Sequence, residues 1–129
     1  MPPEFDVGQG YGKVSWSVRA IWESYAGWFH HESTTELYSV PQRAIHADLI
    51  ELAGGQAALV DRARARFKAG DDEAALHLLD IVLSQPKVEP PALDLALEVH
   101  EKLEGESVNF WLTEWLRHQG RKLTARKEA

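Results

Sequence analysis

Three consecutive residues, His30, His31 and Glu32, have side chains that can bind a metal ion. Imidazole and carboxylate groups are common metal ligands. Adjacent side chains in a loop rarely converge on one ion, however, so we interpret this segment as a polar loop with ordinary hydrogen bonds. The chain contains no Cys, which excludes disulfides, thiolate metal sites and a Cys nucleophile.

A Ser/His/Asp catalytic triad is the second chemistry to consider. Ser33, His46 and Asp48 have the required side chains, but nothing in the sequence places them within hydrogen-bond reach of one another. The chain also lacks the GxSxG pattern of a strained nucleophile turn. We therefore reject this triad. His77 and His100 fall on or beside apolar helix faces, which favours a structural role for both.

Length and charge limit the remaining classes of function. A chain of 129 residues forms one domain with a real hydrophobic core. Its formal net charge of -6 argues against nucleic acid as a partner. No apolar run approaches the ~20 residues that span a bilayer. The first ten residues lack the features of a secretory signal, which predicts a cytoplasmic protein unless a signal was removed or belongs to a larger parent.

Hydrophobic periodicity and Gly/Pro punctuation predict an all-α fold of about six helices. Residues 1–10 read as an extended arm or linker remnant, residues 11–123 as the helical domain, and residues 124–129 as a basic tail. Residues 30–40 form a predicted loop. The predicted helices cover Gly12 or Lys13 to Gly27, Pro41 to Gly54, Gln56 to Ala69, Asp72 to Ser84, Ala92 to Leu103, and Ser107 to Leu123.

The first predicted helix is long and aromatic, and we interpret the rest of the chain as organised around it. Apolar residues recur along it at steps of three and four, and Trp16, Ala20 and Phe29 add apolar surface away from that face. A helix that is apolar around most of its circumference must be buried on most of it. We therefore expect the chain's own core on one side of this helix and a partner on the other.

The third and fourth predicted helices resemble an antiparallel tetratricopeptide pair. The pattern consists of Leu59, Ala63, Gly70-Asp71, Ala75-Leu76, Leu79, Val82 and Pro86. Small Ala residues allow close helix approach, Gly70 permits a tight turn, and Pro86 ends the second helix. About one and a half such units fit, whereas a solenoid needs about three. The aromatic first helix or a second subunit would have to supply the missing burial.

Tyr11-Gly12, Trp16-Ser17-Val18-Arg19 and Gly27-Trp28-Phe29, followed by this helix pair, resemble the dimerisation domain of the alkyl sulfatase family of metallo-β-lactamase-fold hydrolases. The resemblance runs from about Tyr11 to Leu123. It implies an all-α domain that follows a catalytic domain, which holds a zinc pair in an HxHxDH motif and hydrolyses sulfate esters. It also implies that a sterol-carrier-like domain often comes after.

That zinc motif is absent from this chain. None of the six His residues stands in an HxH arrangement beside an Asp, so we expect no cofactor here and assign zinc to the family's catalytic domain. The sequence departs from the family after Phe29, where relatives usually continue Asp-Gly-Asn-Pro and this chain has His-His-Glu-Ser-Thr-Thr. Because of this difference, the resemblance does not establish a sulfate ester as the substrate of any parent enzyme.

We predict a non-catalytic homodimerisation module, whose partners are a second copy and a metallo-β-lactamase-fold domain. The candidate interface residues are Val14, Trp16, Val18, Ile21, Trp22, Tyr25, Trp28, Phe29, Trp111 and Trp115. Core packing remains an equal alternative for Trp111 and Trp115.

Two other functions compete with this prediction. The chain is alternatively part of a zinc-dependent sulfate-ester hydrolase, to whose cleft it contributes Tyr11 and Arg19. The simpler roles for these two residues are a buried anchor for the arm and an ion pair with Glu23. A tetratricopeptide-like peptide-binding domain is a weaker alternative.

Overall fold

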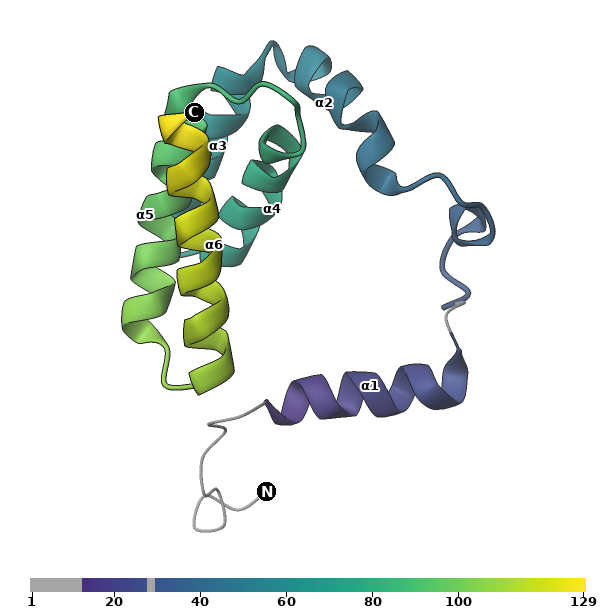
Figure 1. Ribbon diagram of the computed structural model, residues 1–129. Coiled ribbons are helices and arrows are strands. Elements are labelled where there is room, and N and C mark those ends of the chain that lie inside the picture. Colours follow the sequence, from purple (N-terminus) through teal and green to yellow (C-terminus); the bar gives the residue numbers. More distant parts are fainter. Residues whose placement is uncertain (1–12, 28–29) are drawn as a thin grey trace.

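The computed structural model describes residues 13–27 and 30–129 and contains six α-helices and two short 3-10 helices in those ranges (Figure 1). The described residues include no β-strand, which confirms the all-α class. The elements are α1 Val14–Ala26, η2 Thr34–Leu37, η3 Gln42–Ile45, α2 His46–Ala53, α3 Gln56–Lys68, α4 Asp72–Leu83, α5 Pro90–Glu106 and α6 Phe110–Glu128.

Helices α3 to α6 form a bundle with one continuous core. Helix α3 packs against α4, α5 packs against α6, and α5 also contacts α3 and α4. Four fully buried alanines allow these helices to approach closely, and larger aliphatic side chains fill the space between them. The alanines are Ala63, Ala75, Ala92 and Ala96, and the largest fully buried side chains are Leu79, Leu95, Val82 and Val99.

The turn between α3 and α4 forms as the sequence predicts. Gly70 has φ of 85°, a left-handed conformation that glycine adopts without strain. The side chain of Asp71 accepts a hydrogen bond of 3.3 Å from the backbone N–H of Ala74 and so caps α4. The turn makes α3 and α4 an antiparallel pair. The likeness of this helix pair to a tetratricopeptide remains a prediction.

Several predicted helix ends shift by a few residues. Helix α5 begins at Pro90 rather than Ala92, because proline has no N–H and is tolerated in a first helical turn. Helix α6 begins later than Ser107, because the side chain of Asn109 accepts from Leu112 N at 2.9 Å and caps it. The same helix continues past Leu123 to Glu128.

The expectation that the chain's own core covers one side of α1 is wrong. The helix itself lies close to its predicted bounds and ends before Gly27, which has φ of 78°. It has no packed interface with another described helix, so the bundle does not cover it. Figure 1 shows why: η2, η3 and α2 carry the chain away from the bundle, and α1 lies at the far side of an opening.

The side chain of Arg126 in α6 also binds the C-terminal end of α4. Arg126 donates to the backbone oxygens of Leu83 at 3.0 Å and Gln85 at 3.3 Å. These carbonyls lie at the C-terminal end of α4, where helical hydrogen bonding stops. The guanidinium therefore satisfies backbone acceptors of one helix from another and fixes how α6 docks.

We predict that Arg126→Ala lowers the free energy of unfolding by about 1 kcal/mol, the typical net value of such a hydrogen bond. The melting temperature should fall by about 4 °C. The control is Arg121→Ala, because Arg121 makes no hydrogen bond or ion pair with the described residues. Equal losses in both variants, measured by thermal unfolding followed by circular dichroism, would contradict the docking role of Arg126.

Candidate interaction surface

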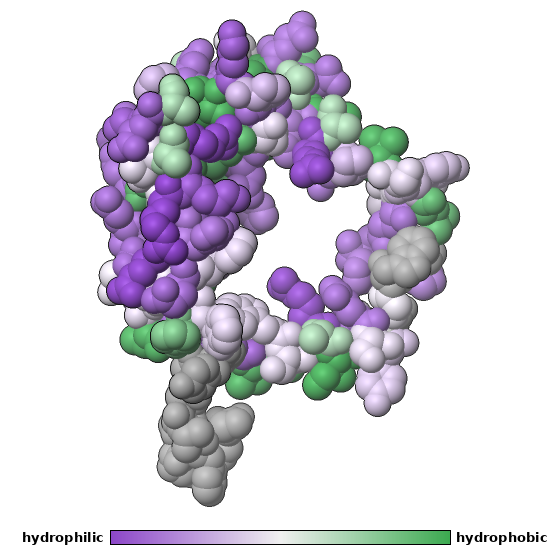
Figure 2. All heavy atoms as spheres, viewed as in Figure 1, coloured by the Kyte–Doolittle hydropathy of each residue, from purple (hydrophilic) through white to green (hydrophobic). Residues whose placement is uncertain are grey.

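The first candidate surface is the α1 stripe, which we define as Val18, Ile21, Trp22 and Tyr25. These side chains follow one another at helical spacing and are exposed, Trp22 by 63% and Tyr25 by 89%. Val14, at the start of the helix, is 52% exposed. In Figure 2, hydrophobic atoms of α1 lie on the outer side of the molecule and its hydrophilic atoms point into the opening.

The sequence of α1 gives the helix little stability of its own. It has 13 residues, no side-chain cap at Lys13, no acidic residue in its first turn and no basic residue in its last. Isolated helices shorter than about 12–15 residues are marginal in water, and most helices in proteins are stabilised by packing of an apolar face. The packing that stabilises α1 is not supplied by the other described helices.

The second surface is the α6 aromatic patch, which we define as Val108, Phe110, Trp111 and Trp115. Val108 is 98% exposed, and each of the three aromatic residues is more than half exposed. The rings of Phe110 and Trp111 meet edge to face with centroids 6.0 Å apart. Val108 lies just before the N-cap residue Asn109, outside α6, although the predicted helix included it.

The candidate residues of the interface thus occupy different positions. Trp111 and Trp115 lie on the surface, at 54% and 58% exposure, and do not join the core. Trp16 is 40% exposed, and the ammonium group of Lys13 stands 5.8 Å from its ring centroid. Trp28, Phe29 and Tyr11 fall outside the described residues. The sequence analysis did not single out Phe110, because it falls off the apolar period of α6.

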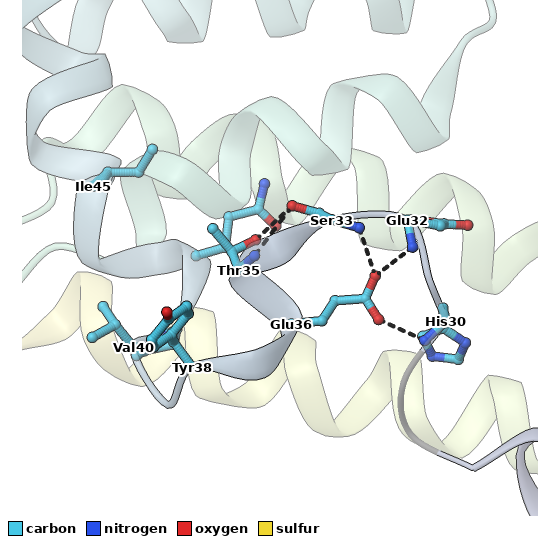
Figure 3. A pocket seen from close by; sticks show the side chains of 10 residues that line it. His30, Glu32, Ser33, Thr35, Glu36, Tyr38, Val40 and Ile45 are labelled. Atoms are coloured by element: carbon cyan, nitrogen blue, oxygen red, sulfur yellow. Dashed lines mark hydrogen bonds between the residues drawn. The ribbon is translucent and has the colours of Figure 1, made fainter.

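The polar loop before α2 is organised by one carboxylate. Glu36 accepts hydrogen bonds from the backbone N–H groups of His30 at 2.6 Å, Glu32 at 3.1 Å and Ser33 at 3.1 Å (Figure 3). These bonds, led by that from His30, lower the pKa of Glu36 despite an opposing contribution from desolvation. The side chain of Ser33 and that of Glu36 together form a capping box at the start of η2.

A hollow of about 670 Å³ opens beside this loop. Tyr38, Val40 and Ile45 line it together with polar residues of the Glu36 turn (Figure 3). Within the described ranges, no three His, Asp or Glu side chains are placed to hold a metal ion. The Glu36 carboxylate accepts hydrogen bonds from backbone donors of the loop.

The remaining candidates for chemistry are dispersed. Ser33 bonds to Thr35 at 2.9 Å, whereas His46 bonds through Nδ1 to the hydroxyl of Ser84 at 2.8 Å, so the rejected triad does not assemble. His100 bonds through Nδ1 to the carbonyl of Ala96 at 2.7 Å, and His77 is exposed. The His46–Ser84 contact joins α2 to the end of α4 across 38 positions, and no sequence signal marks it.

Two further expectations concern charge and membranes. The described part of the chain shows no ion pair between Arg19 and Glu23, so the simple pairing expected for Arg19 is not formed. Arg19 is exposed and follows Val18 directly, so helical geometry places it beside the stripe. None of the described helices combines the length and hydrophobicity that crossing a bilayer requires.

We predict that the loop around Glu36 loses its order as the pH falls. Because the pKa of Glu36 lies below 4.5, its carboxylate is ionised and its three hydrogen bonds are formed above that pH. They are lost as the pH falls through the lowered pKa. The measurement is the amide proton shift of His30 against pH by NMR, with an expected midpoint below 4.5.

The matched variants for this prediction are Glu36→Gln and Glu32→Gln. The first should abolish the titration of the His30 amide and speed its hydrogen exchange. The second should leave both unchanged, because the Glu32 side chain accepts no hydrogen bond from the described residues. A His30 amide that titrates equally in both variants would show that Glu36 does not hold the loop.

Comparison with known proteins identifies a family for this chain. The model of the alkyl sulfatase dimerisation family matches residues 3–124, which include α1, the loop and almost all of the bundle. Comparison with curated proteins gives no match, and neither does comparison with solved structures. The family match covers both candidate surfaces and confirms the resemblance carried by the Trp-Ser-Val-Arg and Gly-Trp-Phe segments. The chain belongs to the alkyl sulfatase dimerisation domain family.

Proposed function

We propose that this chain is a homodimerisation module in which two copies bury the α1 stripe and the α6 aromatic patch against each other. The observation that carries this proposal is a 13-residue helix that exposes Trp22 and Tyr25 and that no other described helix covers. Such a helix gains stability only when its apolar face is packed. Membership of a dimerisation family makes a second copy the natural source of that packing.

The size of the exposed apolar surface supports the proposal. Trp22, Tyr25, Phe110, Trp111 and Trp115 are each more than half exposed. An aromatic side chain that becomes fully buried removes about 150–250 Å² from water. Because part of each of these five side chains is already covered, the area that they can still bury is smaller, roughly 500 Å² in total at the lower end of that range. A stable interface needs about 800 Å² from each partner. The aromatic residues therefore supply most of the required area, and the neighbouring aliphatic residues Val14, Val18, Ile21 and Val108 extend it.

The arrangement of the two surfaces also suits a single interface. Figure 2 shows hydrophobic atoms on the outer side of α1 and at the α5–α6 turn, both at the lower edge of the molecule. A symmetric dimer brings the same patch of both copies face to face, so every apolar residue in it contributes twice. In this proposal a two-fold contact at this edge involves both the stripe and the patch.

The proposed second partner is a catalytic domain of the alkyl sulfatase type. The family name associates this domain with alkyl sulfatases, and the described residues hold no set of ligands that fits zinc. In this proposal the metallo-β-lactamase-fold domain binds the zinc ions and hydrolyses the sulfate ester, whereas the present chain holds two such domains together. The chain alone then has no sulfatase activity.

Analytical ultracentrifugation at low micromolar concentration tests the dimer. We expect a particle of twice the chain mass of 14.5 kDa. Trp22→Glu should raise the dimer dissociation constant by at least about a hundredfold, because a buried aromatic residue at an interface commonly contributes 2 kcal/mol or more and a symmetric dimer contains two copies.

The matched control for Trp22→Glu is Glu23→Ala on the opposite side of α1. It should leave the dissociation constant within about twofold, since its side chain does not belong to the stripe. Circular dichroism should show that α3 to α6 remain folded in both variants. A wild-type chain that sediments cleanly at 14.5 kDa contradicts the proposed function.

A further inference from the structure

The α1 stripe contains a hollow with a specific geometry. Val18, Ile21, Trp22 and Tyr25 surround a shallow, apolar depression of about 390 Å³. Their positions are i, i+3, i+4 and i+7, which is the set of four residues that forms one hole in knobs-into-holes packing. A hole of this kind receives a single side chain from a facing helix. The depression is therefore shaped for another helix rather than for a small ligand.

The residues around the hollow extend this pattern. Val14, Val18, Ile21 and Tyr25 are separated by four, three and four positions, which is the a/d spacing of a coiled coil. Ser17 and Ser24 are seven residues apart and follow one edge of the stripe. Arg19 and Glu23 lie on the other side of the helix from the two serines. The edge of the stripe formed by the two serines thus carries no charge that would repel a like edge.

We propose that the helix facing α1 is the α1 of a second copy, paired antiparallel about a two-fold axis that passes near Ile21. This inference rests on the proposed homodimer and specifies its central contact. The stripe is self-complementary, because the same residues that form the hole of one copy supply the apolar knobs of the other. A two-fold axis requires this kind of surface, in which each patch meets itself.

Two features favour the antiparallel orientation. Antiparallel helices place the positive end of each helix dipole near the negative end of the other. In Figure 1 the N-terminal end of α1 points toward the bundle and its C-terminal end points away from it. Antiparallel pairing consequently places the two bundles at opposite ends of the helix pair, whereas parallel pairing would bring them to the same end.

A membrane surface is a poor alternative partner. Helices that lie in a membrane interface carry Lys and Arg on their polar side, which bind anionic lipids. The charged residues of α1 are one Arg and one Glu, Arg19 and Glu23, so their charges cancel. A further cation at the start of this helix, Lys13, places its ammonium group over the ring of Trp16 within the chain.

Cysteine cross-linking tests the orientation, because the chain contains no Cys of its own. In an antiparallel pair the edge with Ser17 and Ser24 meets the same edge of the partner, so position 17 lies opposite position 24. We expect a 1:1 mixture of the Ser17→Cys and Ser24→Cys proteins, oxidised after subunit exchange, to give at least fivefold more disulfide-linked dimer than either protein alone. Mass spectrometry of the linked peptides identifies the 17–24 bond.

The control mixture combines Arg19→Cys with Glu23→Cys, on the other side of the helix from the two serines, and should give only background cross-linking. A parallel pair would instead bring position 18 of one copy beside position 18 of the other, so efficient self-cross-linking of the Val18→Cys protein overturns the inference. A sedimenting dimer without the 17–24 bond also overturns it but leaves the proposed function standing. A monomeric wild-type chain overturns both.

Discussion

The apolar side of α1 is the constraint on which the arrangement of this domain depends. The helix is short and poorly capped, and its bundle does not cover it. Water is an unfavourable environment for Trp22 and Tyr25, and the backbone of a 13-residue helix gains little by ordering alone. The proposed pairing of two chains would resolve both problems at once, because a contact that removes the aromatic surface from water also stabilises the helix.

The bundle of α3 to α6, in contrast, completes its core within one chain. Fully buried alanines bring its helices close, and Leu79 and Leu95 fill the centre. The sequence reasoning expected the aromatic helix or a second subunit to complete a short tetratricopeptide-like array. Instead, α5 and α6 pack on each other, and α5 also packs on the α3–α4 pair. Because this core is already closed, α1 remains available for contacts outside the chain.

The connection between these two parts is polar and locally organised. Glu36 gathers three backbone donors, the Ser33 side chain caps η2, and His46 ties the start of α2 to Ser84. None of these contacts is a catalytic arrangement. Their common effect is to organise the segment before α2 and the start of α2 by local hydrogen bonds and by one contact with the end of α4. In this loop the backbone N–H groups of His30 and Glu32 donate to Glu36.

The sequence by itself determined the all-α class, the places of the helices and the family. The signals used were local: apolar periods, the turn at Gly70-Asp71 and the helix end at Gly27. Local signals can be read from the sequence without knowledge of the tertiary fold. The tertiary structure alone decided that Trp111 and Trp115 lie on the surface, that α1 leaves its bundle, and that His46 meets Ser84. The physical reason is that a period identifies which side of a helix is apolar, whereas what covers that side depends on residues far away in the chain or on another chain.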